Sequence, residues 1–381
     1  MNNIIDTNNS NKMEKYHLFQ LENFKTLSNL FLKYILELDK EQWAEIVKEL
    51  EPVLNKCDEI DYQSDATAIA YAIWHFLDRY HRIQIMCTSL LKEGYMNYAK
   101  QYDVLDVGTG PSQVLFALSD YFQCLNKIEK NILCTVNPDY VEQSKGFRQF
   151  MHHFVEYSLQ YGKQYLVPFH FGRTEDAINI SFSERYPYKS YKYRYDITVF
   201  NNFLTTKKIT EKCSDTLKDI CKYTRNHGLV IVIGATEKSD KYKEIYNIID
   251  EIINRKFKGW YYYGYWNKVF DREFNYKYED QYGCVLGEYF KNIVNYLKEN
   301  NLWESVSETA KKEFEINSSI PMSENKLKDF KGATWKMVVY RKISRPNLKT
   351  VPKLAKKIVH KNDVRLVDDI WRRDIEISKD K

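Results

Sequence analysis

Short apolar runs alternate with longer amphipathic segments through the middle of this chain. Five of the runs have the length and composition of buried strands, and helical segments separate most of them. They cover residues 102–107, 131–136, 164–171, 195–200 and 228–234. Strands that alternate with helices form parallel βαβ units, so the pattern predicts an α/β fold built on a mostly parallel sheet.

The region before the first strand has a helical pattern instead. Apolar side chains recur at helical spacing between Leu18 and Ile35, and the pattern returns from Glu41 to Lys56. Ser64 then has the character of a helix cap, with a longer helix expected after it. We therefore predict an N-terminal helical region, or lid, over residues 1–100, followed by an α/β core over 101–256.

An unusual run of aromatic residues follows the core. Residues 257–266 read FKGWYYYGYW, and the last core strand is expected later, within 331–345. We predict an aromatic-rich insertion over residues 257–330. Its rings either form a wall beside the active-site edge for a planar acceptor, or pack as a small domain or dimer surface.

The first predicted strand runs directly into a glycine turn. Asp106 lies at its end, Gly108 and Gly110 form a Gly-x-Gly pair, and a helix begins near Gln113. Glycine permits backbone angles that are closed to other residues, so a ligand can approach the main chain. A strand, glycine turn and helix in this order typically bind nucleotide-like ligands at the carboxyl ends of the strands of an α/β sheet.

The residue types in the turn narrow the choice of ligand. A dinucleotide fingerprint needs a third glycine at the position of Gln113. The carboxylate of Asp106 suits a cationic ligand better than it suits pyrophosphate. A phosphate-binding Gly-Lys-Ser/Thr loop is absent, which argues against a nucleotide kinase. The turn therefore favours a positively charged, nucleotide-like ligand over NAD.

Asp-x-Gly-x-Gly at the end of a first strand resembles the cofactor motif of class I S-adenosylmethionine-dependent methyltransferases. The order and spacing of the apolar runs are similar to that family over about residues 101–236. The resemblance implies a Rossmann-like, mostly parallel seven-stranded methyltransferase sheet flanked by helices, with an antiparallel last strand and S-adenosyl-L-methionine as the cofactor. It implies cofactor-binding roles for Asp106, Val107, Gly108, Thr109, Gly110, Pro111, Ser112, Asn137, Asp139, Arg173, Thr174, Asn201 and Asn202.

Two positions depart from the family pattern. The family usually ends its second strand with an acid that accepts hydrogen bonds from both ribose hydroxyls. The matching residue here is Thr135 or Asn137, with Asp139 the nearest acid, and the third loop has Arg173 where an aspartate is common. An active methyltransferase acting on a small-molecule, peptide or RNA acceptor is the first hypothesis. A catalytically inactive relative that binds RNA or a ribosomal particle is the alternative.

The helical region before the core contains one candidate for binding the cofactor's carboxylate. Trp74, Arg79 and Arg82 combine aromatic and basic groups in one short stretch. A guanidinium binds carboxylates through two hydrogen bonds, so an arginine here could pair with the methionine end of the cofactor. The other interpretation is a solvated basic turn between helices.

Composition and charge limit the remaining possibilities. The chain has 381 residues, a net charge of +5, and seven cysteines without the spacing of a metal site. We therefore expect a cytoplasmic protein with reduced thiols, no metal and no membrane span. Eight Lys or Arg residues and no acid occur between positions 341 and 361. This segment, continuing into a tail over 346–381, is either an RNA contact or simply solvated.

Overall fold

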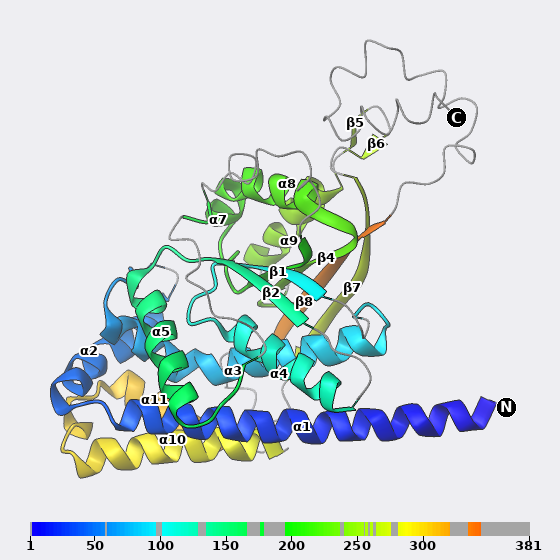
Figure 1. The fold of residues 1–381 in the computed structure, drawn as a ribbon. Helices are drawn as coiled ribbons and strands as arrows, with labels where there is room; N and C mark the ends of the chain where they lie inside the picture. Colours follow the sequence, from blue (N-terminus) through cyan, green and yellow to red (C-terminus); the bar gives the residue numbers. More distant parts are fainter. Residues whose placement is uncertain are drawn as a thin grey trace, which may run out of the picture.

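The described strands form one six-stranded sheet in the order β2-β1-β3-β4-β8-β7 (Figure 1). Strands β2, β1, β3 and β4 are parallel, and β8 runs antiparallel between β4 and β7. The bounds are β1 Gln101–Val107, β2 Thr135–Val141, β3 Tyr195–Asn201, β4 Thr224–Gly234, β7 Tyr265–Asn275 and β8 Thr334–Ile343. A separate hairpin pairs β5 (Lys256–Phe257) with β6 (Trp260–Tyr261).

The structure is a computed structural model. It describes residues 2–57, 59–96, 101–128, 135–165, 176–178, 195–236, 240–254, 256–257, 260–261, 264–275, 281–320 and 334–343. The α/β class and the mostly parallel sheet are confirmed within these ranges, as is the antiparallel last strand. The predicted run at 164–171 lies mostly outside them, so six strands are described and not the seven that were expected.

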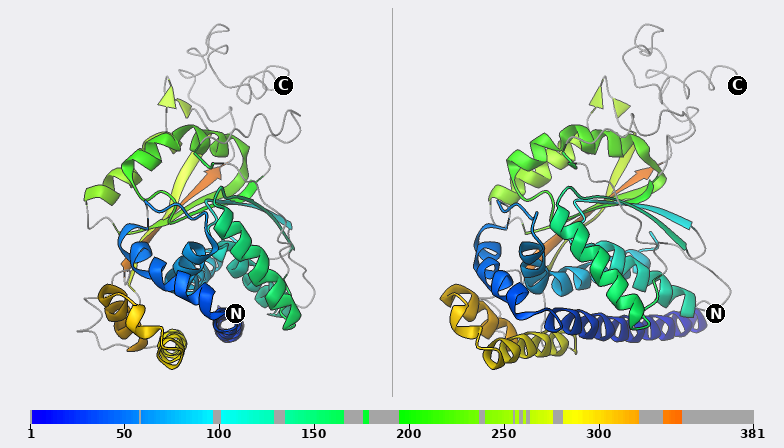
Figure 2. Two further views of the ribbon diagram at one scale, coloured as in Figure 1. Left: turned by 90° about the vertical axis from the view of Figure 1, so that its left-hand side faces the viewer. Right: turned by 60° about the vertical axis from the view of Figure 1, so that its left-hand side comes forward.

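Helices cover both faces of the sheet and add an outer layer (Figures 1 and 2). One face carries α3 (Asp65–Lys92), α4 (Gln113–Ile128) and α5 (Lys145–Gln160). The other carries α7 (Lys207–Lys212), α8 (Ser214–Tyr223) and α9 (Asp240–Ile253). Outside α3 lie α1 (Asn2–Leu36), α2 (Lys40–Lys56), α10 (Gln281–Glu299), α11 (Glu308–Ser318) and the short 3-10 helix η2 (Trp303–Ser305).

Two apolar cores fill the space on the two sides of the sheet. The larger core continues from the sheet through α3 to the outer helices, and includes Phe116 and Tyr289. The smaller core lies under α8 and α9, around Ile220 and Ile249. Because α3 lies between the sheet and the outer helices, it is buried on most sides, and apolar residues recur all round it.

The predicted N-terminal helices are present, and their caps explain where two of them begin. Asp39 and Gln42 form a reciprocal capping box at the start of α2. The Ser64 side chain accepts a hydrogen bond from the Thr67 N–H at 3.1 Å, which begins α3 at the predicted position. Of the helices that the structure describes, none combines the length and hydropathy needed to cross a membrane.

The second strand lies later in the chain than the sequence indicated. It was predicted to end at residue 136, because Asn137, Pro138 and Asp139 favour turns. The structure continues β2 through these residues to Val141, where Tyr140 and Val141 are buried against the sheet. Proline is tolerated in a strand at the edge of a sheet, and β2 is outermost among the described strands. The expected end of the second strand at residue 136 is therefore wrong.

The segment assigned to the aromatic insertion contains a strand of the main sheet. Tyr265 begins β7 and pairs with Ile343, at the end of the sheet opposite to the carboxyl ends of the parallel strands. Trp266 is buried in the smaller core. The helices α10 and α11 then pack against α1 and α2. The described part of this segment therefore forms core and outer helices, and it gives no aromatic wall beside the active-site edge.

The last strand lies within the predicted range of 331–345 and takes in the start of the basic segment. The strand β8 ends at Ile343, and Lys342 within it is buried. Its ammonium group donates to the carbonyl oxygens of Cys221 at 2.7 Å and Thr224 at 3.0 Å. Lys342 thus ties β8 to the end of α8 and is not exposed to phosphates. The rest of the basic segment and the tail lie outside the described residues.

Candidate functional site

A cleft lies where the parallel strands β1, β2 and β3 end. Strand β1 has β2 on one side and β3 on the other. The chain therefore runs from β1 to its neighbour β2, and then crosses to β3 on the opposite side of β1. Ligands of open α/β sheets bind at such a switch point. The cleft encloses about 880 Å³ of empty space, part of it open to solvent, between the glycine turn, the start of α5, α3 and the segment after β3.

The glycine turn forms one side of this cleft. Gly108 and Gly110 both have positive φ angles, of 66° and 56°. The N–H groups of Gly108 and Thr109 donate to the Val141 carbonyl at 3.0 and 3.2 Å, which anchors the turn to the end of β2. Of the atoms that the structure describes, a β-carbon placed at Gly110 would meet only the Gln113 side chain, at 4.0 Å. The turn therefore presents bare backbone to the cleft at Gly110.

Glu142 follows β2 directly, and its carboxylate lines the cleft. It accepts hydrogen bonds from the backbone N–H groups of Gly110 at 2.7 Å and Ser144 at 2.8 Å. Burial raises the pKa of Glu142, and these backbone hydrogen bonds oppose the rise. A carboxylate has about four acceptor positions, so Glu142 can hold these donors and still accept from a ligand.

Asp106 lies beneath the turn and not in the cleft. Its side chain is fully buried, and the Thr109 hydroxyl donates to one carboxylate oxygen. The other oxygen has no hydrogen-bond partner among the residues that the structure describes. Burial raises the pKa of Asp106 to about 7. The Thr109 hydrogen bond lowers this pKa, and the charge of Glu142 raises it further. Asp106 therefore supports the turn and does not itself line the cleft.

Three aromatic rings cover the cleft from the side of the N-terminal helices. Tyr62 stacks on Phe147 with 4.5 Å between ring centroids, and Tyr71 meets the same ring edge-on at 5.0 Å. The Arg79 guanidinium lies 4.8 Å above the Tyr71 ring, and it also lines the cleft. Its neighbour Arg82 instead pairs with Asp78 at 2.8 Å, within α3. Of the two candidate arginines, the structure brings Arg79 to the cleft.

The segment before α3 sits directly on the first turn of α5. The Gly146 N–H donates to the Tyr62 carbonyl at 3.0 Å, and a β-carbon at Gly146 would lie 2.3 Å from the Ser64 carbonyl oxygen. Such a contact excludes every residue except glycine at position 146. The close approach holds Tyr62 over the cleft.

The segment after β3 forms the opposite wall. Asn201 and Asn202 both line the cleft. Asn202 has a φ of 52°, and its N–H donates to the Ile233 carbonyl of β4 at 2.8 Å. Asparagine tolerates this left-handed conformation better than most residues. Phe203 follows immediately and lines the cleft as well.

The other predicted site residues have different surroundings. Asn137 donates to Asp103 at 2.8 Å, and Asp139 accepts from the Tyr195 hydroxyl at 2.6 Å, so both side chains bind elsewhere along the strands. Val107 and Ser112 are buried within the turn, as is Pro111, while Thr109 reaches the cleft. Arg173 and Thr174 lie outside the described residues.

Sequence reasoning missed Glu142 and Phe203. Glu142 is the acid at the end of the second strand that was sought at Thr135 or Asn137. The apolar pair Tyr140–Val141 just before it was the available signal, and the turn-forming residues at 137–139 hid it. Phe203 had no signal of its own, because a single aromatic after a strand is common in any core.

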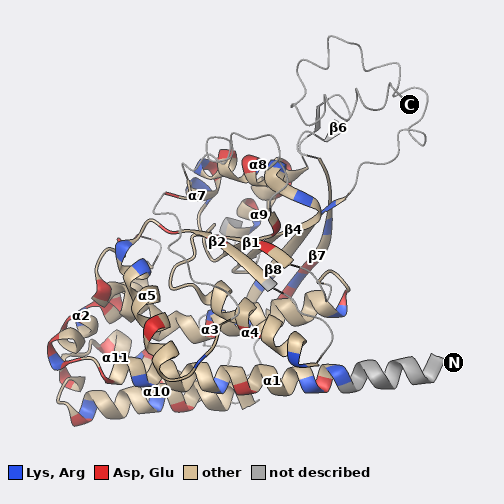
Figure 3. Ribbon diagram, viewed as in Figure 1, with Lys and Arg blue, Asp and Glu red and all other residues tan. Residues whose placement is uncertain are grey.

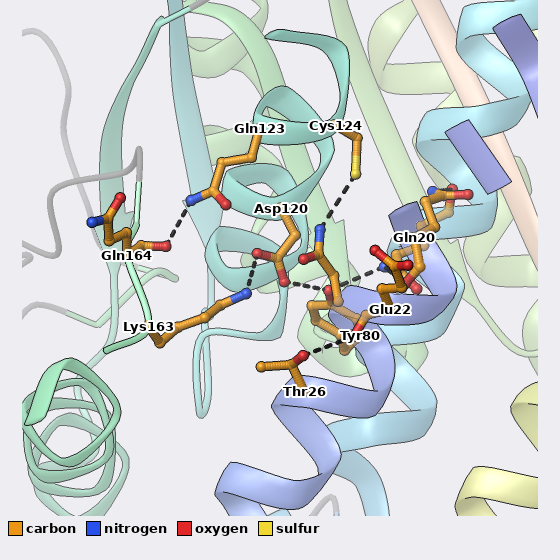
Figure 4. Close-up of polar contacts among 11 residues, drawn as sticks. Gln20, Glu22, Thr26, Tyr80, Asp120, Gln123, Cys124, Lys163 and Gln164 are labelled. Carbon is orange, nitrogen blue, oxygen red and sulfur yellow. Dashed lines mark hydrogen bonds and ion pairs between the residues drawn. The ribbon is translucent and has the colours of Figure 1, made fainter. Parts of the chain in front are cut away.

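A buried polar network joins α3, α4 and the segment after α5 (Figure 4). Asp120 of α4 accepts from the Lys163 ammonium at 2.6 Å and from the Tyr80 hydroxyl at 2.5 Å. The side chains of Asp120 and Lys163 are only 1% and 6% exposed. The helix α4 follows the glycine turn and α3 carries Arg79, so this network holds both in one arrangement. By contrast, Figure 3 shows charges of both signs spread over the outer helices.

Comparisons with known proteins find distant structural matches. Models of protein families give no match, and curated protein sequences give none either. A Haemonchus contortus phosphoethanolamine N-methyltransferase 2 with bound S-adenosylhomocysteine matches with 13% identity and a TM-score of 0.38, over 75% of this chain and 61% of that chain. This chain therefore spans less than two thirds of the length of that enzyme.

Two further solved structures match over most of their own length. A loganic acid methyltransferase with S-adenosylhomocysteine has 9% identity and a TM-score of 0.40, over 75% of this chain and 98% of that chain. The [4+2]-cyclase SpnF has 10% identity and a TM-score of 0.36, over 80% and 95%.

All these TM-scores are below 0.5, so these matches do not decide the fold. The fold is described from the strand order of this chain. The described sheet has its switch point between β1 and β3, and an antiparallel strand lies between β4 and β7. The antiparallel last strand is the one that the resemblance implied. The described part of the chain therefore has a Rossmann-like α/β fold with a mostly parallel sheet.

Proposed function

We propose that this protein is an S-adenosylmethionine-dependent methyltransferase whose cofactor binds at the carboxyl ends of β1, β2 and β3. The observation that carries the proposal is the position of Glu142. Its carboxylate stands at the end of the second strand, 2.7 Å from the N–H of Gly110, in the wall of the cleft. An acid there can accept hydrogen bonds from two ribose hydroxyls while it holds the turn.

The residues around Glu142 fit the rest of such a cofactor. Gly110 leaves open space beside its backbone, which a bulky ligand needs. Arg79 offers a guanidinium to the carboxylate of the methionine end. Among the described residues, one oxygen of the buried Asp106 has no hydrogen-bond partner, and a cationic ligand nearby would favour the ionised form of this carboxyl.

The chemistry requires mainly positioning from the protein. When bound, S-adenosylmethionine supplies a methyl carbon activated by its sulfonium. The chain has to hold the donor, align an acceptor and exclude water, which can supply much of the rate. Tyr62, Tyr71 and Phe147 shield the cleft from water, and the amides of Asn201 and Asn202 can orient an acceptor. The proposal covers small-molecule, peptide and RNA acceptors.

The placement of Glu142 weakens the case for a degenerate site. That case rested in part on Thr135 or Asn137 standing where an acid was expected, and β2 now ends beside Glu142. Its other basis, Arg173, lies outside the described residues. The same acid would also suit the ribose of NAD. Against NAD stands Gln113, which is buried at the start of α4 where a dinucleotide site needs its third glycine.

Isothermal titration calorimetry tests the proposal directly. We expect saturable binding of S-adenosylmethionine and S-adenosylhomocysteine below millimolar concentration, and no comparable heat with NAD. Absence of binding by both S-adenosyl compounds, or tighter binding of NAD, contradicts the proposal. Mass spectrometry of a lysate incubated with isotopically labelled cofactor then identifies the acceptor.

A glycine pair provides the matched control. Gly110→Arg directs a long side chain into the cleft, so we expect it to abolish cofactor binding while circular dichroism stays native-like. Gly94→Arg introduces the same residue at a similar positive φ of 73°, where no atom of the described residues lies within 4 Å of the new β-carbon, and Gly94 does not line the cleft. Normal binding by the Gly110 variant would show that the turn is misassigned.

A further inference from the structure

The ring of Phe203 lies directly on Gly108. A β-carbon built at Gly108 would stand 2.2 Å from Cδ2, 2.7 Å from Cγ and 2.9 Å from Cε2 of this ring. A β-carbon built at Gly110 would have no atom of the described residues closer than Gln113 Oε1, at 4.0 Å. The two glycines of the turn therefore have different reasons to be glycine: Gly110 leaves room for a ligand, and Gly108 leaves room for Phe203.

The backbone on both sides of Phe203 holds the ring in this place. Asn202 takes a left-handed conformation and bonds to β4 through its N–H. On the other side, the Phe203 carbonyl accepts from the Thr205 N–H at 3.1 Å, and the Thr206 hydroxyl caps α7 by accepting from the Ile209 N–H at 3.1 Å. Phe203 is thus part of a short bridge anchored at both ends, and its ring is partly buried against the smaller core.

The order of the strands decides which part of a ligand meets this ring. This step rests on the proposed function. If Glu142 at the end of β2 binds the ribose, the turn after β1 lies under the next part of the cofactor, and the wall after β3 lies beyond it. In S-adenosylmethionine, the atom that follows the ribose is the sulfonium sulfur with its methyl group. Phe203 and Gly108 line the cleft together on that side.

We propose that Phe203 sets the size of the group that the cleft accepts on the sulfonium. Its ring fills the space over Gly108 that is continuous with the cleft, so a longer alkyl group meets the ring. Replacement by a smaller side chain opens that space, because the backbone bridge is anchored independently of the ring. Phe203 is in this respect a specificity-determining residue that acts by excluded volume.

The experiment compares two cofactors in four proteins. Calorimetry measures the dissociation constants of S-adenosylmethionine and S-adenosylethionine for wild type, Phe203→Leu, Phe203→Ala and Phe147→Ala. One methylene in a tight apolar site is worth about 10-fold or more in discrimination. We expect wild type to prefer the methyl compound by about this factor, Phe203→Ala to lose most of the preference, and Phe203→Leu to lose part of it. The aromatic control Phe147→Ala keeps the wild-type ratio.

The ratio of the two dissociation constants separates this role from general support of the fold. A loosened cleft would weaken the binding of both compounds to the same extent and leave the ratio unchanged. An unchanged ratio in both Phe203 variants overturns the inference, and so does an equal shift in the Phe147 variant. If wild type binds neither S-adenosyl compound, the proposed function fails and the inference fails with it. If wild type binds S-adenosylmethionine but the ratio of the two dissociation constants is the same in wild type and in the Phe203 variants, only the inference fails.

Discussion

The carboxylate of Glu142 accepts a hydrogen bond from the backbone N–H of Gly110 at 2.7 Å. This contact joins the residue that follows β2 to the turn that follows β1. It places an acid and a bare stretch of backbone side by side in one cleft wall. Together they form one side of the cleft in which we propose that the cofactor binds.

Glu142→Gln should weaken binding of S-adenosylmethionine by about 10- to 100-fold. The amide keeps the size of the carboxylate and loses acceptor positions, and a hydrogen bond to a charged group contributes about 1.5–3 kcal/mol. Calorimetry measures the effect. Asp139→Asn is the matched control, because Asp139 was the nearest acid by sequence and here accepts from the Tyr195 hydroxyl, along the strands and away from the cleft. Equal losses in the two variants would mean that Glu142 has no special role.

Gly108→Ala should destabilise the protein more than Gly110→Ala. Both glycines have similar positive φ angles, so both variants bear a backbone strain of about 1 kcal/mol. Only the methyl group at position 108 also meets the Phe203 ring. Urea unfolding measures the difference. In a double-mutant cycle, Phe203→Ala should reduce the cost of Gly108→Ala, and strictly additive effects would contradict the contact.

Asp106 should make stability fall as the pH rises from about 4 to about 7. Over this range the folded protein keeps a proton that the unfolded chain has already released, because the folded pKa is raised to about 7. The slope reaches about 1.4 kcal/mol per pH unit. Asp106→Asn removes this slope, so its stability relative to wild type should improve by about 2–3 kcal/mol between pH 5 and pH 7.5.

The comparison between variants is needed because other groups also titrate. Burial raises the pKa of Glu142, which acts in the same direction as Asp106. Burial lowers the pKa of His75 to about 4 and of His81 to about 3, and both act in the opposite direction below about pH 6.5. The histidine contributions are common to wild type and Asp106→Asn and cancel in the difference. Removing the Asp106 carboxyl also removes its interaction with Glu142, so the measured slope belongs to this pair of acids. A constant offset across the pH range would refute the role given to Asp106.

Lys163→Met should cost about 3–5 kcal/mol of unfolding free energy, because it leaves the buried Asp120 without its cation. Burial already raises the pKa of Asp120, and Lys163 opposes that rise. Lys48→Met breaks an exposed pair with Glu45, also at 2.6 Å, and should cost less than about 1 kcal/mol. Urea unfolding compares the two variants, and similar small losses would show that the Asp120 network is not needed for stability.

The sequence correctly predicted those parts of the fold that depend on local patterns. Alternating apolar runs predicted the parallel strands, and Ser64 predicted the start of α3. The Gly-x-Gly pair predicted a turn with positive φ at Gly108 and Gly110. Strand ends were harder to predict, because the turn preference of Asn137, Pro138 and Asp139 is weaker than the pairing of β2 with β1.

By itself, then, the chain determined its α/β class, its N-terminal helices and the glycine turn, since each depends on neighbours within a few residues. Only the tertiary structure decided that Glu142 faces Gly110, that Phe203 covers Gly108, and that Tyr265 opens a sheet strand far from the cleft. The first two pairs are 32 and 95 positions apart in the sequence. Such contacts arise from the order in which strands pair, which no local periodicity records.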